Sequence, residues 1–202
     1  MQTDRRRWDD RYREGAYTRR PWPSAILSEL ADQGVLPPAR GARALDVACG
    51  AGRNSLYLAQ LGYRVDAMDV SPVALARAAD TAISRGVRVN WQCRDLVAQP
   101  PLLVKGQYAV ITLIRFMLPE YARLLVPALA PGGLLIVEEH LQWPYSSALA
   151  GPQSERFRVA PGDMLDALLT VAPEAQAVHQ YEGLREDPDG ASVALSQLAA
   201  RL

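Results

Sequence analysis

The stretch Ala44-Leu45-Asp46-Val47-Ala48-Cys49-Gly50-Ala51-Gly52-Arg53-Asn54 decides the fold class. Residues 43–47 have the pattern of a buried strand, which runs directly into a turn with two glycines two positions apart. A helical pattern over residues 54–61 begins where this turn ends. Glycine permits a positive φ and a close approach of a ligand to the main chain, and a helix start presents unpaired N–H groups. The stretch therefore predicts a binding pocket for a small-molecule cofactor.

Outward from this stretch, strand-like and helix-like spacings of apolar residues alternate. Strand patterns lie at 43–47, 64–68, 87–93, 108–114 and 134–140, and helical spacing lies at 25–32, 54–61, 72–84 and 118–129. This alternation predicts an α/β fold, in which a mostly parallel sheet carries helices on both faces. Near the C-terminus, 161–171 reads as a helix, and 175–181 and 192–199 read as strands joined by the turn 187–190. We expect these two strands to form an antiparallel hairpin at one edge of the sheet.

Length and composition narrow the class of protein. The 202 residues are 49% apolar, and 22 basic residues balance 22 acidic ones, so no broad positive field would attract nucleic acid or an anionic membrane. No segment reaches the roughly 20 apolar residues of a membrane span. Cys49 and Cys93 have no metal-type spacing, and no metal site is expected. We expect a cytoplasmic monomer or homodimer with a small-molecule substrate, made of an N-terminal arm (1–20) and a single domain (21–202).

The spacing of the glycines separates two kinds of cofactor pocket. A dinucleotide fingerprint requires Gly-x-Gly-x-x-Gly, and Ser55 stands where the third glycine would be. The pattern Asp-x-x-Cys-Gly-x-Gly over residues 46–52 instead resembles motif I of the class I S-adenosylmethionine (SAM) methyltransferases. Residues 63–75, 129–135 and 157–165, and Trp-Asp-x-Arg-Tyr at 8–12, look like the tellurite-resistance and thiopurine-type branch of these enzymes.

This resemblance implies a Rossmann-like class I methyltransferase sheet, SAM as the cofactor, and methyl transfer to a thiol, a chalcogen oxyanion or a hydroxyl of a small molecule. Asp69 ends the second strand, where a carboxylate can accept hydrogen bonds from both ribose hydroxyls. The family places an acid such as Asp95 against the adenine amino group, and Asp46 would face the methionine ammonium, directly or through water. The other cofactor-binding residues that we expect are Trp8, Tyr12, Ala48, Cys49, Gly50, Gly52, Asn54, Val70, Leu96, Leu113 and Ile114.

The expected catalytic residues are Arg115 and His140, at the tips of the fourth and fifth strands. Methyl transfer from a sulfonium is an in-line displacement that depends on positioning in a dry pocket and requires no metal. An arginine can hold an anionic acceptor, and a histidine with a pKa near 6.5 can take a proton or only donate a hydrogen bond. For each residue, the competing interpretation is that its side chain, at the strand tip, donates a hydrogen bond to the carbonyl oxygen of a loop.

The N-terminal arm is expected to close over this pocket. The aromatic residues Trp8, Tyr12 and Tyr17 are spaced so that they can share one helix face, with Trp8 and Tyr12 over SAM. A mobile lid and a permanently docked cover are both consistent with this pattern.

Three other functions compete with this interpretation. A SAM-binding sensor or partner subunit would have the same motif without catalysis. An NAD-dependent oxidoreductase would need the third glycine and a catalytic Tyr-x-x-x-Lys, whereas the only lysine is Lys105. A protein or nucleic-acid methyltransferase would normally add a recognition domain or a basic face.

Overall fold

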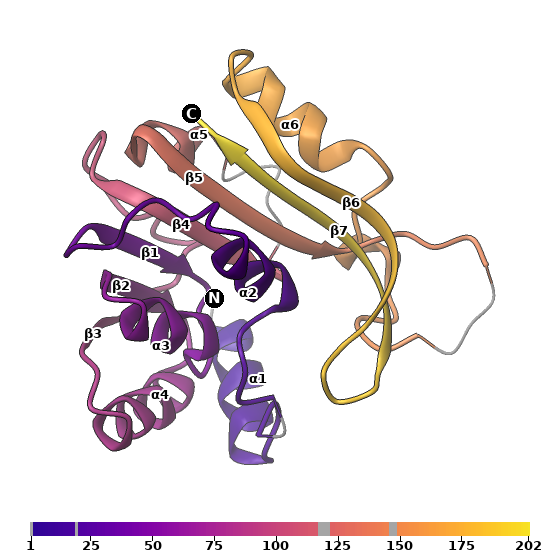
Figure 1. Ribbon diagram of the computed structural model, residues 1–202. Coiled ribbons are helices and arrows are strands. Elements are labelled where there is room, and N and C mark those ends of the chain that lie inside the picture. The colour runs from indigo at the N-terminus through magenta and orange to yellow at the C-terminus, as the bar shows by residue number, and fades with distance from the viewer. Residues whose placement is uncertain (1, 19, 117–121, 146–148) are drawn as a thin grey trace.

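The computed structural model describes residues 2–18, 20–116, 122–145 and 149–202 (Figure 1). Seven strands form one sheet in the order β3-β2-β1-β4-β5-β7-β6. The strands are β1 (Arg43–Val47), β2 (Arg64–Asp69), β3 (Val89–Cys93), β4 (Tyr108–Ile114), β5 (Leu129–His140), β6 (Gln176–Glu186) and β7 (Ser192–Arg201). The helices are α1 (Gln2–Arg13), α2 (Ala25–Asp32), α3 (Arg53–Gln60), α4 (Pro72–Ser84), α5 (Ala122–Leu125) and α6 (Asp163–Val171), with short 3₁₀ turns η1 (Val126–Ala128) and η2 (Glu155–Phe157).

The sheet is parallel except for β7. The pairs β3·β2, β2·β1, β1·β4 and β4·β5 are parallel, and β7 is antiparallel to both β5 and β6. The predicted Rossmann-like sheet with an antiparallel C-terminal hairpin is therefore confirmed. The strand order reverses between β1 and β4, and ligands of open parallel sheets bind beyond the carboxyl ends of the strands at such a point.

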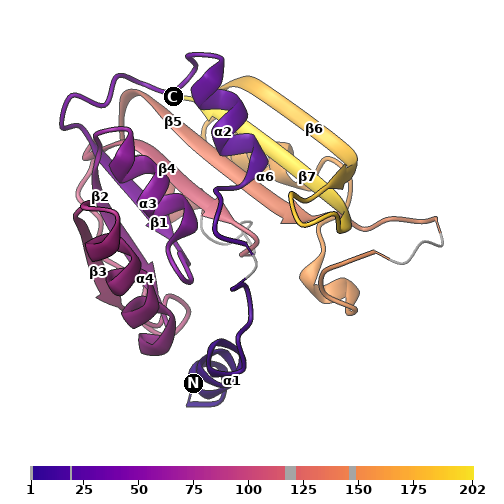
Figure 2. The same cartoon turned by 60° about the horizontal axis from the view of Figure 1, so that its bottom comes forward.

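Helices cover both faces of the sheet (Figure 2). Alternate residues of β1 point to opposite faces, so that Ala44 packs with α2 and α3 while Leu45 packs with α5 and α6. The first cluster includes Ile26, Leu27, Leu30, Leu58, Val110 and Ile136, and the second includes Ile111, Leu113, Leu125, Leu135, Val137 and Leu168. These two layers hold the strand tips in fixed positions relative to one another.

Several elements have the predicted bounds, and a few differ. The bounds of β1, β4, α2 and α4 agree with the sequence patterns residue for residue. The helix expected over 118–129 is represented by α5 and η1, and 118–121 lies outside the described residues. β5 begins at Leu129 instead of 134, because Leu129 pairs with Tyr108 before the register shifts. Gly132 and Gly133 therefore lie inside this strand.

The N-terminal arm begins as a helix that packs against α4 (Figure 1). The helix α1 ends at Arg13, and Gly15 follows with a φ of 89°. Tyr17 therefore lies beyond the helix, and its ring approaches the ring of Tyr12 at 5.8 Å between centroids through the turn. The expectation that all three aromatic residues share one helix face holds for Trp8 and Tyr12 and is wrong for Tyr17.

Candidate functional site

The carboxyl ends of β1 and β4 carry two residues with unusual backbone conformations. Ala48 follows β1 with a φ of 54°, and Arg115 follows β4 with a φ of 59°. Such conformations cost a non-glycine residue on the order of 1–3 kcal/mol and concentrate at functional sites. The glycines of the same loop, Gly50 and Gly52, have φ values of 56° and 79°. The strained tips mark this edge of the sheet as the candidate site.

Asp69 connects the glycine loop to the tip of β2. One carboxylate oxygen accepts a hydrogen bond from the Gly50 amide at 2.8 Å, and the other accepts one from the Ser71 amide at 2.8 Å. Burial raises the pKa of Asp69, and these N–H donors oppose the rise. The Ser71 hydroxyl caps α4 by accepting from the Ala74 amide, so the cap does not depend on Asp69. The carboxylate therefore lies at the expected tip, beside the loop that would meet a cofactor.

The arm covers the glycine loop. A Cβ atom on Gly50 would overlap the Tyr12 hydroxyl, so a larger residue there would force the Tyr12 side chain to shift. A Cβ on Gly52 would lie 2.6 Å from the ring of Trp91 in β3. Tyr12 is buried, and burial and the nearby Asp69 carboxylate raise the pKa of its hydroxyl. The structure therefore places Tyr12, as expected, directly at the loop.

Polar contacts hold the arm in this position. The Ser71 hydroxyl donates to Asp9 at 2.6 Å, and both residues are buried. The Arg77 guanidinium donates to the carbonyl oxygens of Tyr12 and Ala16. Trp8 lies one turn before Tyr12 with a centroid separation of 6.3 Å and is half-buried.

Asp46 lies beneath the loop. The Ser55 hydroxyl donates to one carboxylate oxygen at 2.5 Å and the Thr112 hydroxyl to the other at 2.8 Å. The side chain is 1% exposed, and burial raises its pKa to about 6. The expected contact of Asp46 with a ligand ammonium, directly or through water, stays a prediction. The hydrogen bond from Ser55 to Asp46 also gives this serine a structural role at the position where a dinucleotide fingerprint has its third glycine.

Two of the expected cofactor residues, Asn54 and Leu113, have structural contacts. The Asn54 side-chain oxygen accepts hydrogen bonds from the amide and the hydroxyl of Ser24, which begins α2, and this turns the side chain toward α2. Leu113 is fully buried in the core, because it points from β4 toward α5 and α6. The assignment of these two residues to the cofactor stays a prediction. The amide of Asn54 still belongs to the first turn of α3.

The remaining expected cofactor residues surround the loop or the neighbouring tips. Cys49 is buried, and burial raises the pKa of its thiol well above the ordinary value, which fits a packing residue. Asp95 follows β3, and one of its oxygens accepts from the amides of Val97 and Ala98. Leu96 and Ile114 are buried, and Val70 is partly exposed after β2.

Arg115 lies in a network of charges at the tip of β4. Its guanidinium donates to Glu138 at 3.0 Å and, through two nitrogens, to both oxygens of Asp187 at 2.7 and 2.9 Å. Arg20 of the arm pairs with the same Asp187 at 3.0 Å. The structure therefore joins Arg115 to two carboxylates, which neutralise the charge that was expected to hold an acceptor.

His140 ends β5 beside this network. Burial and the neighbouring guanidinium groups of Arg115 and Arg158 lower the pKa of His140 to about 3. The imidazole is therefore neutral near pH 7, and of its two expected roles hydrogen bonding fits while proton uptake does not. Its Nδ1 atom is buried and has no hydrogen-bond partner within the described part of the chain.

Arg53 is a functional candidate that the sequence analysis missed. It is the first residue of α3, and its charge interacts electrostatically with Asp46 and with the Arg115 network. A helix N-terminus disfavours a cation, because the helix dipole is positive there. An arginine directly after Gly52 was therefore a signal that the sequence already contained.

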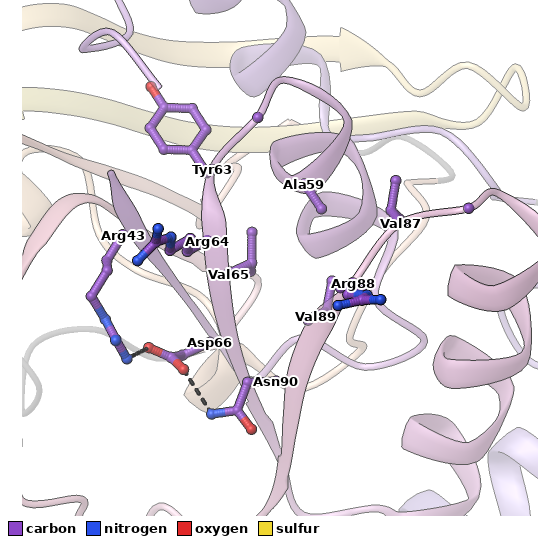
Figure 3. Close-up of a pocket in the computed structure, with 12 residues that line it drawn as sticks. Arg43, Ala59, Tyr63, Arg64, Val65, Asp66, Val87, Arg88, Val89 and Asn90 are labelled. Atoms are coloured by element: carbon purple, nitrogen blue, oxygen red, sulfur yellow. Dashed lines mark hydrogen bonds and ion pairs between the residues drawn. The ribbon is translucent and has the colours of Figure 1, made fainter. Parts of the chain in front are cut away.

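A surface groove of about 650 Å³ lies at the other end of the sheet (Figure 3). It is lined by residues that begin β1, β2 and β3, among them Arg43, Asp66 and Asn90. Asp66 accepts hydrogen bonds from Arg43 at 2.5 Å, from Asn90 at 2.8 Å and from the Tyr108 hydroxyl at 3.0 Å. Its polar groups bond one another, and the groove lies away from the strained tips.

A sheet in this order, with a glycine loop after β1 and an acid at the tip of β2, defines the class I methyltransferase fold. Residues 44–133 match the family model described as a methyltransferase domain. By its strand order and by this match over residues 44–133, the chain has the fold of the class I methyltransferases. Among the described residues, no helix is both long and apolar enough to cross a membrane.

Known proteins similar to the chain agree with this class. A ubiquinone biosynthesis O-methyltransferase of Xanthomonas euvesicatoria is 32% identical over 118 residues, which are 54% of this chain and 48% of that protein. The chain thus spans about half the length of the curated relatives it matches.

Solved structures share the fold at low sequence identity. TehB from Haemophilus influenzae has a TM-score of 0.68 and 19% identity, over 96% of this chain and 66% of that one. A SAM-dependent methyltransferase from Mesorhizobium loti has a TM-score of 0.64 and 18% identity, over 87% and 98%. The [4+2]-cyclase SpnF has a TM-score of 0.67 and 19% identity, over 87% and 79%. The fold alone therefore does not fix the reaction.

Proposed function

We propose that the chain is a SAM-dependent methyltransferase that acts on a small molecule with a thiol, chalcogen oxyanion or hydroxyl group. The observation that carries this proposal is the Asp69 carboxylate, which binds the Gly50 amide and thereby joins the glycine loop to the tip of β2. A buried carboxylate at this position provides the acceptor that a ribose diol needs, and the loop beside it has no side chain at Gly50 and Gly52.

The chain's own residues supply the binding and the exclusion of water. Asp69 would accept from the ribose hydroxyls, Asp95 would lie near the adenine, and the start of α3 would approach the methionine tail. Asp46 supports the loop from beneath through Ser55. Tyr12 and Trp8 would cover the pocket and keep it dry. When bound, SAM supplies a methyl group on a positively charged sulfur, which is already an activated leaving group.

The tips of β4 and β5 are where an acceptor would be positioned. Alignment of two reactants in a closed site contributes roughly 7–11 kcal/mol to lowering a barrier, so a soft thiolate or oxyanion needs no strong base. The neutral state of His140 agrees with such an acceptor, because this imidazole would be a weak base. Arg115 would act as a positioning residue, through its bonds to Glu138 and Asp187.

A second candidate is a SAM-binding protein without catalysis, such as a sensor or partner subunit. The observation that favours it is that Glu138 and Asp187 already bind the Arg115 guanidinium. The charge that was expected to hold an anionic acceptor is therefore already neutralised. The experiment that separates the two is turnover of SAM to S-adenosylhomocysteine with a panel of thiols, selenite, tellurite and phenols. Tight SAM binding without product from any acceptor would favour the sensor. Tight NAD binding without a response to SAM would contradict both.

The wider setting of the protein follows from the same features. The balance of 22 basic and 22 acidic residues supports a partner that is a small molecule and not a nucleic acid. We place the protein in the cytoplasm as a monomer or homodimer, with an arm over residues 1–20 and a single domain over 21–202. Light scattering of the purified chain tests the oligomeric state.

A further inference from the structure

The turn between β6 and β7 carries a buried carboxylate, that of Asp187. The residue directly follows β6, its amide donates to the Ala191 carbonyl at 2.9 Å, and its carbonyl accepts from the Gly190 amide at 2.8 Å. In the sheet, β5 and β7 separate β6 from β4, but the hairpin of β6 and β7 extends past the end of β5 (Figure 1). The turn can therefore bring Asp187 to the tip of β4, a strand with which β6 does not pair.

Two arginines from distant parts of the chain share this carboxylate. Arg115, directly after β4, donates to both of its oxygens at 2.7 and 2.9 Å. Arg20, at the end of the arm, pairs with one of the same oxygens at 3.0 Å and with the exposed Asp189 of the turn at 2.7 Å. The side chain of Asp187 therefore connects the arm to the tip of β4.

The tip of β4 requires support from its surroundings. Arg115 has a φ of 59°, a conformation that a residue other than glycine keeps only where the structure around it holds it. Its guanidinium donates to the carboxylates of Glu138 and Asp187. Glu138 is fixed inside the sheet, because β5 pairs with β4 and β7 and because Gln197 donates to its second oxygen at 2.8 Å. Of these two carboxylates, it is Asp187 whose position depends on a turn and on the arm.

Docking of the arm and the conformation of Arg115 should therefore depend on each other. With Arg20 in place, Asp187 is held from two sides while both of its oxygens accept from Arg115. Without Arg20 the turn loses two ion pairs, and the strained residue is left with one of its two carboxylates less firmly held. Interactions that share one group are not additive, so a change at one arginine is transmitted to the other.

We propose that Asp187 is a positioning residue that couples docking of the arm to the strained conformation of Arg115. Tyr12 of the same arm lies against the glycine loop at Gly50, so the arm covers the cofactor side of the site while Arg20 reaches the acceptor side. The two sides would then close as one unit. This consequence rests on the proposed function, whereas the coupling itself is a property of the chain without ligand.

Hydrogen exchange of single amides in the ligand-free chain, followed by ¹H–¹⁵N NMR, tests the coupling. The Arg115 amide, which donates to a carbonyl of β5, reports on the tip of β4, and the Ala16 amide, which donates to the Arg11 carbonyl, reports on the arm. Arg20→Gln removes the ion pairs from the arm to the turn, and we expect it to speed exchange of both amides about three- to tenfold. The matched control Arg13→Gln removes an ion pair within α1 and should leave the Arg115 amide within about twofold of the unsubstituted chain.

The reverse experiment starts at the strand. Arg115→Lys removes the paired donors to Asp187, so it should speed exchange of the Ala16 amide in the arm. If Arg20→Gln does not fold, Arg20→Lys replaces it, because lysine also lacks the paired donors of the guanidinium. An Arg115 amide that responds no more to the substitution at Arg20 than to the control would overturn the inference. Equal acceleration of the Ile111 amide inside β4 would overturn it as well, since that result would show a loss of overall stability and no specific coupling.

S-adenosylhomocysteine extends the test to the site. At saturation it should slow exchange of both the Ala16 and the Arg115 amides in the unsubstituted chain. Asp187→Asn should keep the slowing at Ala16 and lose most of it at Arg115. Full slowing at both amides in this variant would show that the ligand acts on each side separately, and it would reject closure as one unit. If calorimetry detects no binding of S-adenosylhomocysteine, the proposed function fails, while the ligand-free measurement still decides the coupling.

Discussion

At the scale of single residues, Glu139 of β5 has a strongly perturbed acid–base equilibrium. It is 2% exposed, one of its oxygens has no hydrogen-bond partner among the described residues, and burial raises its pKa to about 8. In the unfolded chain a glutamate has a pKa of about 4.3. The folded state therefore binds the proton more tightly, and the free energy of unfolding falls as pH rises between about 4.3 and about 8. One such group changes this free energy by at most about 1.4 kcal/mol per pH unit.

Glu139→Gln should remove this dependence, because the amide stays neutral at every pH. Urea unfolding of the variant and of the unsubstituted chain, between about pH 5 and about pH 8, should give a difference that grows in favour of the variant as pH rises. Glu174→Gln is the matched control, since Glu174 is exposed. Parallel stability curves for the two proteins would show that Glu139 is not protonated in the folded state.

Asp69 is the residue on which cofactor affinity should depend most. Asp69→Asn removes the charge that would accept from a ribose and replaces one acceptor oxygen with a donor group. Because hydrogen bonds to charged groups contribute about 1.5–3 kcal/mol, we expect S-adenosylhomocysteine affinity to fall by roughly 10- to 150-fold in calorimetry. Asp80→Asn, on the exposed side of α4, should bind normally. Unchanged affinity in a folded Asp69→Asn protein would restrict Asp69 to holding Gly50 and Ser71.

At the scale of elements, the arm is held by contacts that a single substitution can weaken. Arg77 donates to two carbonyl oxygens of the arm, so Arg77→Gln should loosen α1 from α4. Loss of one such bond, at about 1.5 kcal/mol, should increase the opened fraction about tenfold. Trypsin should then cleave at the arginines of the arm about tenfold faster than in the unsubstituted chain, as judged by mass spectrometry.

The same digestion tests whether the arm is a lid. If α1 closes over the cofactor, S-adenosylhomocysteine should protect the arm in both proteins, and Tyr12→Ala should reduce this protection, because Tyr12 lies on the loop at Gly50. Arg88→Gln serves as a control with one arginine fewer outside the arm. Cleavage rates that do not respond to the ligand would identify α1 as a permanent cover.

The sequence alone was sufficient to predict the features of the fold that depend on residues close together in the chain. The alternation of short apolar runs with helical spacing predicted β1, β4, α2 and α4 with their observed bounds, because each of these elements carries its own pattern and end signals. The start of β5 was missed, since it depends on the pairing of Leu129 with Tyr108 across the sheet. The pattern of residues along one segment does not show with which residue of another strand it pairs.

The candidate site shows the same difference between features that local sequence predicts and features that depend on long-range contacts. The glycine loop and Asp69 could be located from the sequence, because strand tips in a parallel sheet meet at one edge. The partners of the side chains could not, since Asn54 turns to Ser24 thirty residues away and Arg115 bonds Asp187 seventy-two residues away. These long-range contacts changed the interpretation of Asn54 and Arg115 more than any local feature did.

At the scale of the whole molecule, a ligand that binds only the folded chain must stabilise all of it. At a concentration of one hundred times its dissociation constant, S-adenosylhomocysteine should add about 2.7 kcal/mol to the free energy of unfolding. For a chain of this length, each kcal/mol raises the melting temperature by about 2–4 °C, so we expect an increase of roughly 5–11 °C by calorimetric or fluorescence melting. NAD at the same concentration should leave the melting temperature unchanged, because Ser55 bonds Asp46 where a dinucleotide site needs glycine. Asp69→Asn, with its affinity lowered 10-fold or more, should lose about half of the increase or more. An equal shift with NAD would mean that the loop at the tip of β1 accepts a dinucleotide.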